Sequence, residues 1–157
     1  MVVIRRFKSE DAEAVSSLIR RNLIEVNTID YPVLEMEILA DSYNSRKVLN
    51  IAVNSHMYVA VNDNQIIGCG AISDYWGSIS ESIFLTIFVL PELHKKGIGR
   101  KIINALESDE YFLRANRIEI PSSITAYEFY HKLGYNYKDG KKELVEGHYC
   151  LEKFRLL

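Results

Sequence analysis

The chain has 157 residues, within the usual range for one domain, and 48% of them are apolar, which is enough to bury a core without disulfides or metals. Its 19 basic and 21 acidic residues give a net charge of −2 and are spread along the chain, whereas nucleic-acid binding normally requires a clustered basic face. We therefore expect a single domain over residues 1–157 that binds no nucleic acid.

The N-terminal segment and the cysteines predict a cytoplasmic protein. Met1–Arg6 reaches charge too soon to be a signal peptide or a membrane span, so we expect no membrane partner. The two cysteines, Cys69 and Cys150, are too few for a disulfide scaffold and lie in segments with a strand pattern, where an unpaired cysteine behaves as a small buried hydrophobe.

The first third of the chain predicts a short strand followed by two helices. Val2 to Phe7 has a strand pattern, and Ser9 is a candidate helix cap. A helix ending near Leu23 is predicted by apolar residues at helical spacing, namely Ala12, Val15, Leu18, Ile19 and Leu23. After the cap-and-proline pattern Asp30-Tyr31-Pro32, a second apolar stripe predicts another helix that buries Leu34, Ile38 and Leu39.

The middle of the chain predicts a hairpin and a central strand. Met57 to Val61 and Gln65 to Ile72 are apolar runs joined by Asn62-Asp63-Asn64, residues that tolerate a tight reversal. Ser82 to Val89 is nearly continuous in apolar residues, the pattern of a strand covered on both faces.

The last third predicts alternating helices and strands. Gly99 to Leu106 is helical in pattern, and Arg117 to Ile120 is a strand stopped by Pro121. A helix from Thr125 to Leu133 has a capping box formed by Thr125 and Glu128, and Gly134 closes it. Two final strands surround a polar turn and span Tyr135 to Tyr137 and Tyr149 to Phe154. This order of elements predicts a mixed α/β sheet.

The segment from Val89 to Arg100, which joins the central strand to a helix, has the chemistry of a phosphate site. Gly97 and Gly99 allow unusual backbone torsions and close approach of a ligand, and the first turn of the next helix leaves its N–H groups unpaired. Three cations flank the glycines: Lys95, Lys96 and Arg100. We name residues 94–100 the glycine loop and expect it to bind pyrophosphate.

Two other phosphate motifs do not fit this loop. The Gly-Lys-Ser/Thr end of a P-loop is absent, and a dinucleotide fingerprint requires a small residue where Ile102 stands. The structural alternative is a glycine-containing turn with solvated lysines, because short glycine patterns are weak signals.

The chain resembles the GCN5-related N-acetyltransferase (GNAT) superfamily, whose signature after a strand is Gln/Arg-x-x-Gly-x-Gly/Ala. Residues 94–99, His-Lys-Lys-Gly-Ile-Gly, match this signature except that His94 replaces Gln or Arg. A second family feature aligns with residues 123–130 and with Leu133-Gly134-Tyr135, where Ser123 replaces an asparagine. The resemblance covers nearly the whole chain and implies a central mixed sheet of about six to seven strands flanked by about four helices.

The resemblance implies that acetyl-coenzyme A is the cosubstrate of a direct acetyl transfer to a primary amine in a ternary complex. The pantetheine arm would pair with the backbone of Phe88 and Val89. The other implied cofactor-binding residues are His94, Lys95, Lys96, Gly97, Ile98, Gly99, Arg100, Ser123, Ala126 and Tyr130.

Tyr130 matches the tyrosine that protonates the leaving thiolate in many relatives, and a phenol remains protonated at neutral pH. It also belongs to an apolar helical stripe, so a core role is the alternative. Glu119, His148 and Glu81 are candidate bases, and each is also a plausible surface or ion-paired group; a water chain is equally open.

The resemblance implies that the acceptor is a small-molecule or peptide amine, and its identity is left open. Tyr31, Tyr75 and Trp76 are candidates to line its site, although Tyr75 and Trp76 could equally pin a loop to the core. The four histidines lack metal-ligand spacing, so we expect no metal. A homodimer, acyl groups other than acetyl, and a catalytically inactive CoA-binding sensor module are left open.

Overall fold

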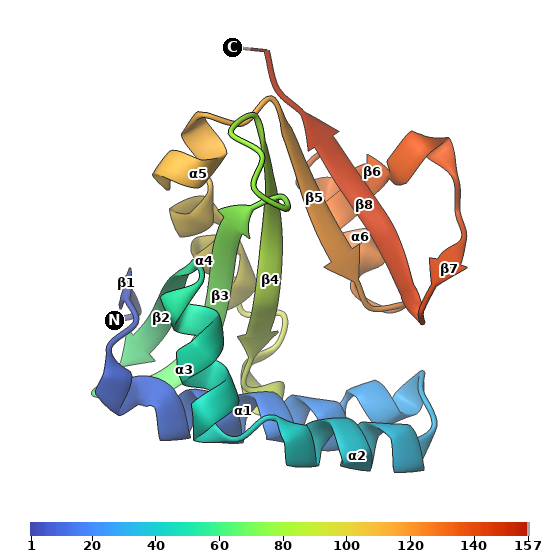
Figure 1. The fold of residues 1–157 in the computed structure, drawn as a ribbon. Coiled ribbons are helices and arrows are strands. Elements are labelled where there is room, and N and C mark those ends of the chain that lie inside the picture. The colour runs from blue at the N-terminus through green and yellow to red at the C-terminus, as the bar shows by residue number, and fades with distance from the viewer. Residues whose placement is uncertain (157) are drawn as a thin grey trace.

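The structure is a computed structural model that describes residues 1–156 and contains an eight-stranded sheet (Figure 1). The strands are β1 (Val3–Arg6), β2 (His56–Asn62), β3 (Gln65–Asp74), β4 (Glu81–Val89), β5 (Arg117–Ser122), β6 (Asn136–Tyr137), β7 (Leu144–Val145) and β8 (His148–Phe154). The helices are α1 (Ala12–Glu25), α2 (Val33–Ser42), α3 (Ser45–Val53), α4 (Ile98–Leu106), α5 (Glu110–Leu113) and α6 (Tyr127–Lys132).

The sheet has the order β1-β2-β3-β4-β5-β8-β6, and β7 also pairs with β8. All neighbours are antiparallel except β4 and β5, which are parallel and are joined by a crossover through α4 and α5. Helices α1 to α3 lie on one face of the sheet and α4 and α6 on the other (Figure 1). The predicted mixed α/β sheet is confirmed, with more strands and helices than expected because β7, α3 and α5 were not predicted.

The predicted hairpin forms between β2 and β3. Asp63 and Asn64 occupy its turn with φ values of 49° and 63°, the left-handed conformation that a two-residue reversal requires. The apolar runs of the two strands bury Met57, Val59 and Ile67, so local sequence determined this unit.

Two details of the first helices differ from prediction. Ser9 does not cap α1; it begins a 3₁₀ turn, Ser9–Asp11, and the carboxylate of Asp11 accepts the Lys8 N–H at 2.8 Å. Helix α2 buries Met36 and Ala40, while the predicted Leu34 and Ile38 are 67% and 64% exposed. Apolar residues occur on both sides of α2, so periodicity did not identify the side that packs on α1.

Strand β5 continues through Pro121 rather than stopping before it. The Arg155 N–H donates to the Asn116 carbonyl at 2.8 Å, so Asn116 belongs to a hydrogen-bonded pair of the β5–β8 ladder. Hydrogen-bonded and unbonded pairs alternate along an antiparallel ladder, so Pro121 belongs to an unbonded pair and its nitrogen points away from β8. Because that edge of β5 has no partner strand at Pro121, the missing N–H costs no ladder hydrogen bond.

The predicted capping box of α6 does not form. The helix begins at Tyr127 with Ala126 as its N-cap, and Thr125 lies in the preceding turn without a capping hydrogen bond. The predicted end is confirmed, because Gly134 follows the helix with φ +96°.

Asp109 joins β2 to the N-terminus of α5. Its side chain is 2% exposed and accepts from His56 Nδ1 at 2.9 Å, the Tyr58 hydroxyl at 2.7 Å and the Tyr111 N–H at 2.9 Å. One carboxylate thus caps a helix and satisfies two side chains of the neighbouring strand.

Candidate active site

The parallel strands β4 and β5 pair over a short stretch only. Glu81–Ile83 lies opposite Arg117–Glu119, and the pairing ends there although β4 continues through residues 84–89. Helices α1 and α4 contact β4 from opposite faces of the sheet, as expected, although residues 85–89 of the strand are only half-buried. The edge of β4 that faces β5 is left open over its second half.

A bulge in β4 accounts for this separation. Phe88 lies opposite Cys69 but Leu85 lies opposite Ala71, so Thr86 and Ile87 share a single partner on β3. Thr86 has φ +56°, a strained conformation for a β-branched residue, and its carbonyl accepts from the Cys69 thiol at 3.3 Å. A bulged strand bends, which turns the end of β4 away from β5.

The glycine loop lies at the carboxyl end of β4 and leads into α4. Gly97 has φ +83°, and Lys95 has φ +62°. The Lys101 N–H donates to the Gly97 carbonyl at 3.2 Å, so the N–H groups of residues 98–100 have no acceptor within the helix. A Cβ built on Gly97 would meet no atom within 4 Å, which leaves space for a ligand beside these donors.

The other predicted residues of the glycine loop divide between backbone and side-chain roles. Ile98 is buried, so it presents only its backbone to a ligand, while Lys95, Lys96 and Arg100 are exposed. Positive side chains and free N–H groups at the start of a helix together favour an anion. The predicted His94 is different, because its Nε2 lies 2.8 Å from the Val89 carbonyl oxygen of the same chain.

Helix α6 packs against the glycine loop. A Cβ on Gly99 would lie 3.1 Å from the Phe129 ring, so the two family motifs meet in space. Ser123 and Ala126 are half-buried in the turn before α6, and the Ala126 N–H donates to the Ser123 carbonyl at 3.3 Å.

Tyr130 is 6% exposed, and burial raises the pKa of its phenol. Within residues 1–156 its hydroxyl has no hydrogen-bond partner, yet no fully buried side-chain oxygen of that range is left unsatisfied. The hydroxyl therefore keeps contact with solvent at the end of a buried ring. It is protonated at neutral pH and free to donate a proton or a hydrogen bond.

Two of the candidate bases, Glu81 and Glu119, bind the same arginine. Arg117 donates to Glu81 at 3.0 Å, to Glu119 at 2.5 Å and to Glu152 at 2.7 Å. Lys138 Nζ also lies 3.0 Å from Glu119, and the hydrogen bond to this carboxylate raises the pKa of the Lys138 ammonium group. Arg117 therefore holds both candidate carboxylates in one ion-pair network.

His148 and Tyr31 lie at and beside the β7–β8 turn. His148 is exposed at the start of β8, and its side chain has no hydrogen bond or ion pair within residues 1–156. Tyr31 is half-buried, donates to the Gly147 carbonyl at 2.6 Å and accepts the Ile124 N–H at 3.2 Å. It links the loop before α2 to the β7–β8 turn and to the loop before α6.

Tyr75 and Trp76 lie at the other end of β4 from the glycine loop. The Tyr75 ring lies 5.4 Å from the Arg117 guanidinium, and its hydroxyl accepts from Lys138 at 3.5 Å. Trp76 is 88% exposed. The structure does not bring Trp76 to the glycine loop, whereas Tyr75 covers the Arg117 ion pairs.

The comparisons with known proteins agree with this geometry. A sequence model of the acetyltransferase (GNAT) domain matches residues 53–137, more than half of the chain. The chain belongs to the GNAT acetyltransferase family. The match spans the hairpin, the bulged strand β4, the glycine loop and α6. No curated protein matches the chain by sequence.

Solved GNAT structures share the fold. The PaiA N-acetyltransferase from Thermoplasma acidophilum, in complex with coenzyme A, superposes with a TM-score of 0.85 at 19% identity over 99% of both chains. A GCN5-related N-acetyltransferase from Rhodopseudomonas palustris gives 0.82 at 18% identity, covering 98% of this chain and 95% of its own. An aminoglycoside 6′-N-acetyltransferase complexed with coenzyme A gives 0.73 at 20% identity, covering 97% and 96%.

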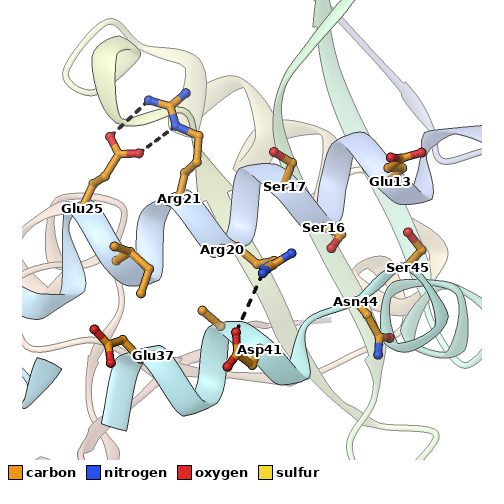
Figure 2. Close-up of a pocket in the computed structure, with 12 residues that line it drawn as sticks. Glu13, Ser16, Ser17, Arg20, Arg21, Glu25, Glu37, Asp41, Asn44 and Ser45 are labelled. Carbon is orange, nitrogen blue, oxygen red and sulfur yellow. Dashed lines mark hydrogen bonds and ion pairs between the residues drawn. The ribbon is translucent and has the colours of Figure 1, made fainter. Parts of the chain in front are cut away.

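A groove of about 670 Å³ between α1 and α2 is separate from the GNAT site (Figure 2). Two ion pairs lie along it: Arg20 lies 3.8 Å from Asp41, and Arg21 lies 2.8 Å from Glu25 (Figure 2). None of the predicted site residues lines this groove. It is therefore not the candidate acetyl-transfer site.

Sequence reasoning missed Thr86, Arg117 and Asn22. No local signal marks Thr86, because a bulge depends on the pairing with β3. Arg117 was counted as the start of a strand, and its three carboxylate partners come from three strands. Asn22 interrupts the apolar stripe of α1 at a buried position, a signal that the sequence did carry.

Two absences apply to the part of the chain that the structure describes. Residues 1–156 include no cluster of three or more histidine, cysteine, aspartate or glutamate side chains arranged to hold a metal ion. Within the same residues, every helix is too short or too polar to span a membrane. The cytoplasmic location remains a prediction.

Proposed function

We propose that this GNAT protein is an acetyl-coenzyme A-dependent N-acetyltransferase whose acceptor is a primary amine of a small molecule or peptide. The observation that carries the proposal is the open second half of the β4 edge, which leads through the turn Pro91–Leu93 into the glycine loop. An extended arm with amide groups can pair with an open strand edge, as an added strand does. The pyrophosphate attached to that arm would then reach the free N–H groups at the start of α4.

The residues at the site fit this cosubstrate. Gly97 leaves open space, and the exposed Lys95, Lys96 and Arg100 supply positive charge. Bound acetyl-coenzyme A supplies a thioester, and attack by a neutral amine in a ternary complex releases its thiol. The hydroxyl of Tyr130 is the proton donor to the leaving sulfur, because it is protonated, unpaired within residues 1–156 and in contact with solvent.

Proton removal from the amine requires an acceptor without a strong ion pair. Glu81 and Glu119 are already bound by Arg117, so neither carboxylate is free to meet the amine. We therefore favour His148, acting directly or through water. His148→Gln is expected to slow thiol release with coenzyme A affinity unchanged; an equal rate would assign proton removal to water alone.

The deciding experiment is calorimetric titration of acetyl-coenzyme A, followed by thiol release against a panel of amines. Micromolar binding with amine-dependent release supports the enzyme and begins to name its acceptor. Binding without release for every amine favours a CoA-binding sensor module, and no binding refutes the proposal.

A further inference from the structure

The carbonyl oxygen of Val89, the last residue of β4, accepts from two side chains outside the sheet. Asn22 Nδ2 on α1 lies 2.9 Å away, and His94 Nε2 in the glycine loop lies 2.8 Å away. Asn22 is 3% exposed, and its amide nitrogen also donates to the Leu18 carbonyl at 3.0 Å. Both hydrogen-bond partners of the Asn22 side chain are carbonyl oxygens. Because carbonyl oxygens only accept hydrogen bonds, the NH₂ group of Asn22 must face them.

The hydrogen-bond pattern of the sheet shows where this carbonyl points. The Leu90 N–H donates to the Ile67 carbonyl at 2.9 Å, and the next pair along the ladder is Val89 with Gly68. Antiparallel ladders alternate between hydrogen-bonded and unbonded pairs, so both backbone groups of Val89 point away from β3 toward the open edge. Helix α1 passes across this end of β4 (Figure 1) and brings Asn22 to it.

We propose that Asn22 and His94 are positioning residues that fix which backbone group β4 offers to the cosubstrate. This inference rests on the proposed binding of acetyl-coenzyme A. With both lone pairs of the Val89 carbonyl in use, the N–H is the one backbone group of Val89 that is still open to a ligand. An amide-bearing arm must then place a carbonyl oxygen opposite that N–H, which sets its register along β4.

The same contacts assign His94 a role that differs from direct phosphate binding. Its ring closes the glycine loop onto the strand that precedes it, and this contact fixes the path of the chain between Val89 and Gly97. Phosphate contacts then rest on the N–H groups of residues 98–100 and on the neighbouring cations.

Two ligands separate positioning of the arm from phosphate binding. One is coenzyme A, and the other is adenosine 3′-phosphate 5′-diphosphate, which is coenzyme A without its pantetheine arm. Asn22→Leu removes the buried donor at similar volume. His94→Gln keeps a donor near the position of Nε2, and His94→Asn moves the donor to the position of Nδ1.

We expect Asn22→Leu and His94→Asn to weaken coenzyme A binding about tenfold, the effect of one misplaced hydrogen bond of about 1.4 kcal/mol. Affinity for the truncated ligand is expected to stay within about twofold, and His94→Gln to retain coenzyme A affinity. Calorimetry measures all of these values, with Asn104→Leu at an exposed position of α4 as the control.

Three outcomes would overturn the inference. Unchanged coenzyme A affinity in Asn22→Leu and His94→Asn would remove the positioning role. Equal losses for both ligands would assign His94 to the phosphates. If the parent protein binds no coenzyme A, the proposed function fails first. Thermal unfolding establishes whether Asn22→Leu is folded at the titration temperature. If Asn22→Leu is unfolded, the comparison of His94→Asn with His94→Gln decides the question, because His94 is exposed.

Discussion

The variant Gly97→Ala tests two roles of Gly97: its left-handed backbone conformation, which affects stability, and the open space beside it, which is proposed to admit phosphate. Gly97 has φ +83°, and a Cβ there would meet no atom within 4 Å. The methyl group therefore causes no clash, and its cost to the free energy of unfolding is the left-handed conformation alone, about 1–2 kcal/mol. The same methyl group occupies the space where phosphate is proposed to approach, so we expect coenzyme A affinity to fall by at least about tenfold, or about 1.4 kcal/mol.

Gly140→Ala is the matched control, because Gly140 has φ +71° and open space but lies away from the glycine loop. Both variants are measured by urea unfolding and by calorimetric titration of coenzyme A. Similar losses of stability are expected, with weakened binding in the Gly97 variant only; Gly97→Trp should abolish binding. If Gly97→Ala binds coenzyme A as tightly as Gly140→Ala does, the assignment of this loop to the pyrophosphate is refuted.

Three further predictions test other parts of the structure. Tyr130→Phe should lower amine-dependent thiol release about a hundredfold with coenzyme A affinity unchanged, and equal release would leave Tyr130 a core residue. Asp109→Ala should reduce the free energy of unfolding by about 3 kcal/mol in urea, because it leaves a helix end and two side chains without their acceptor; a loss under about 1 kcal/mol would contradict this. The hydrogen bond from Arg5 lowers the pKa of Asp11, so its stabilisation is present above the unfolded pKa of about 4 and is lost as pH falls through the lower folded value. Asp11→Asn should therefore be less stable than the parent at pH 7 and converge with it in acid; a constant difference would refute the ion pair's contribution.

The fit between local pattern and structure was good wherever a few neighbouring residues decide the conformation. The Asp63-Asn64 turn, the start of α4 after Gly97 and the end of α6 at Gly134 all depend on backbone torsions that single residues favour. The glycine loop and residues 123–135 resemble the family signatures, and this resemblance was enough to predict the family and its fold. The comparisons confirm both.

Local pattern failed where another element supplied the deciding contact. Leu34 and Ile38 have the spacing of a buried stripe, but α1 packs against Met36 and Ala40 instead. Thr125 has the sequence of a cap, but the turn before α6 places the helix start two residues later. A favourable local arrangement is worth about 1 kcal/mol, which tertiary packing readily outweighs.

The sequence by itself determined the glycine loop, the order of most strands and helices, and the family, because these depend on residue types and short spacings along the chain. The tertiary structure alone decided the separation of β4 from β5, the ion pairs that hold Glu81 and Glu119, and the contact of Asn22 with Val89. Asn22 and Val89 are 67 positions apart, and Arg117 and Glu152 are 35 apart. Such contacts depend on how the sheet and its helices pack, and one sequence read along its length contains no local signal that pairs them.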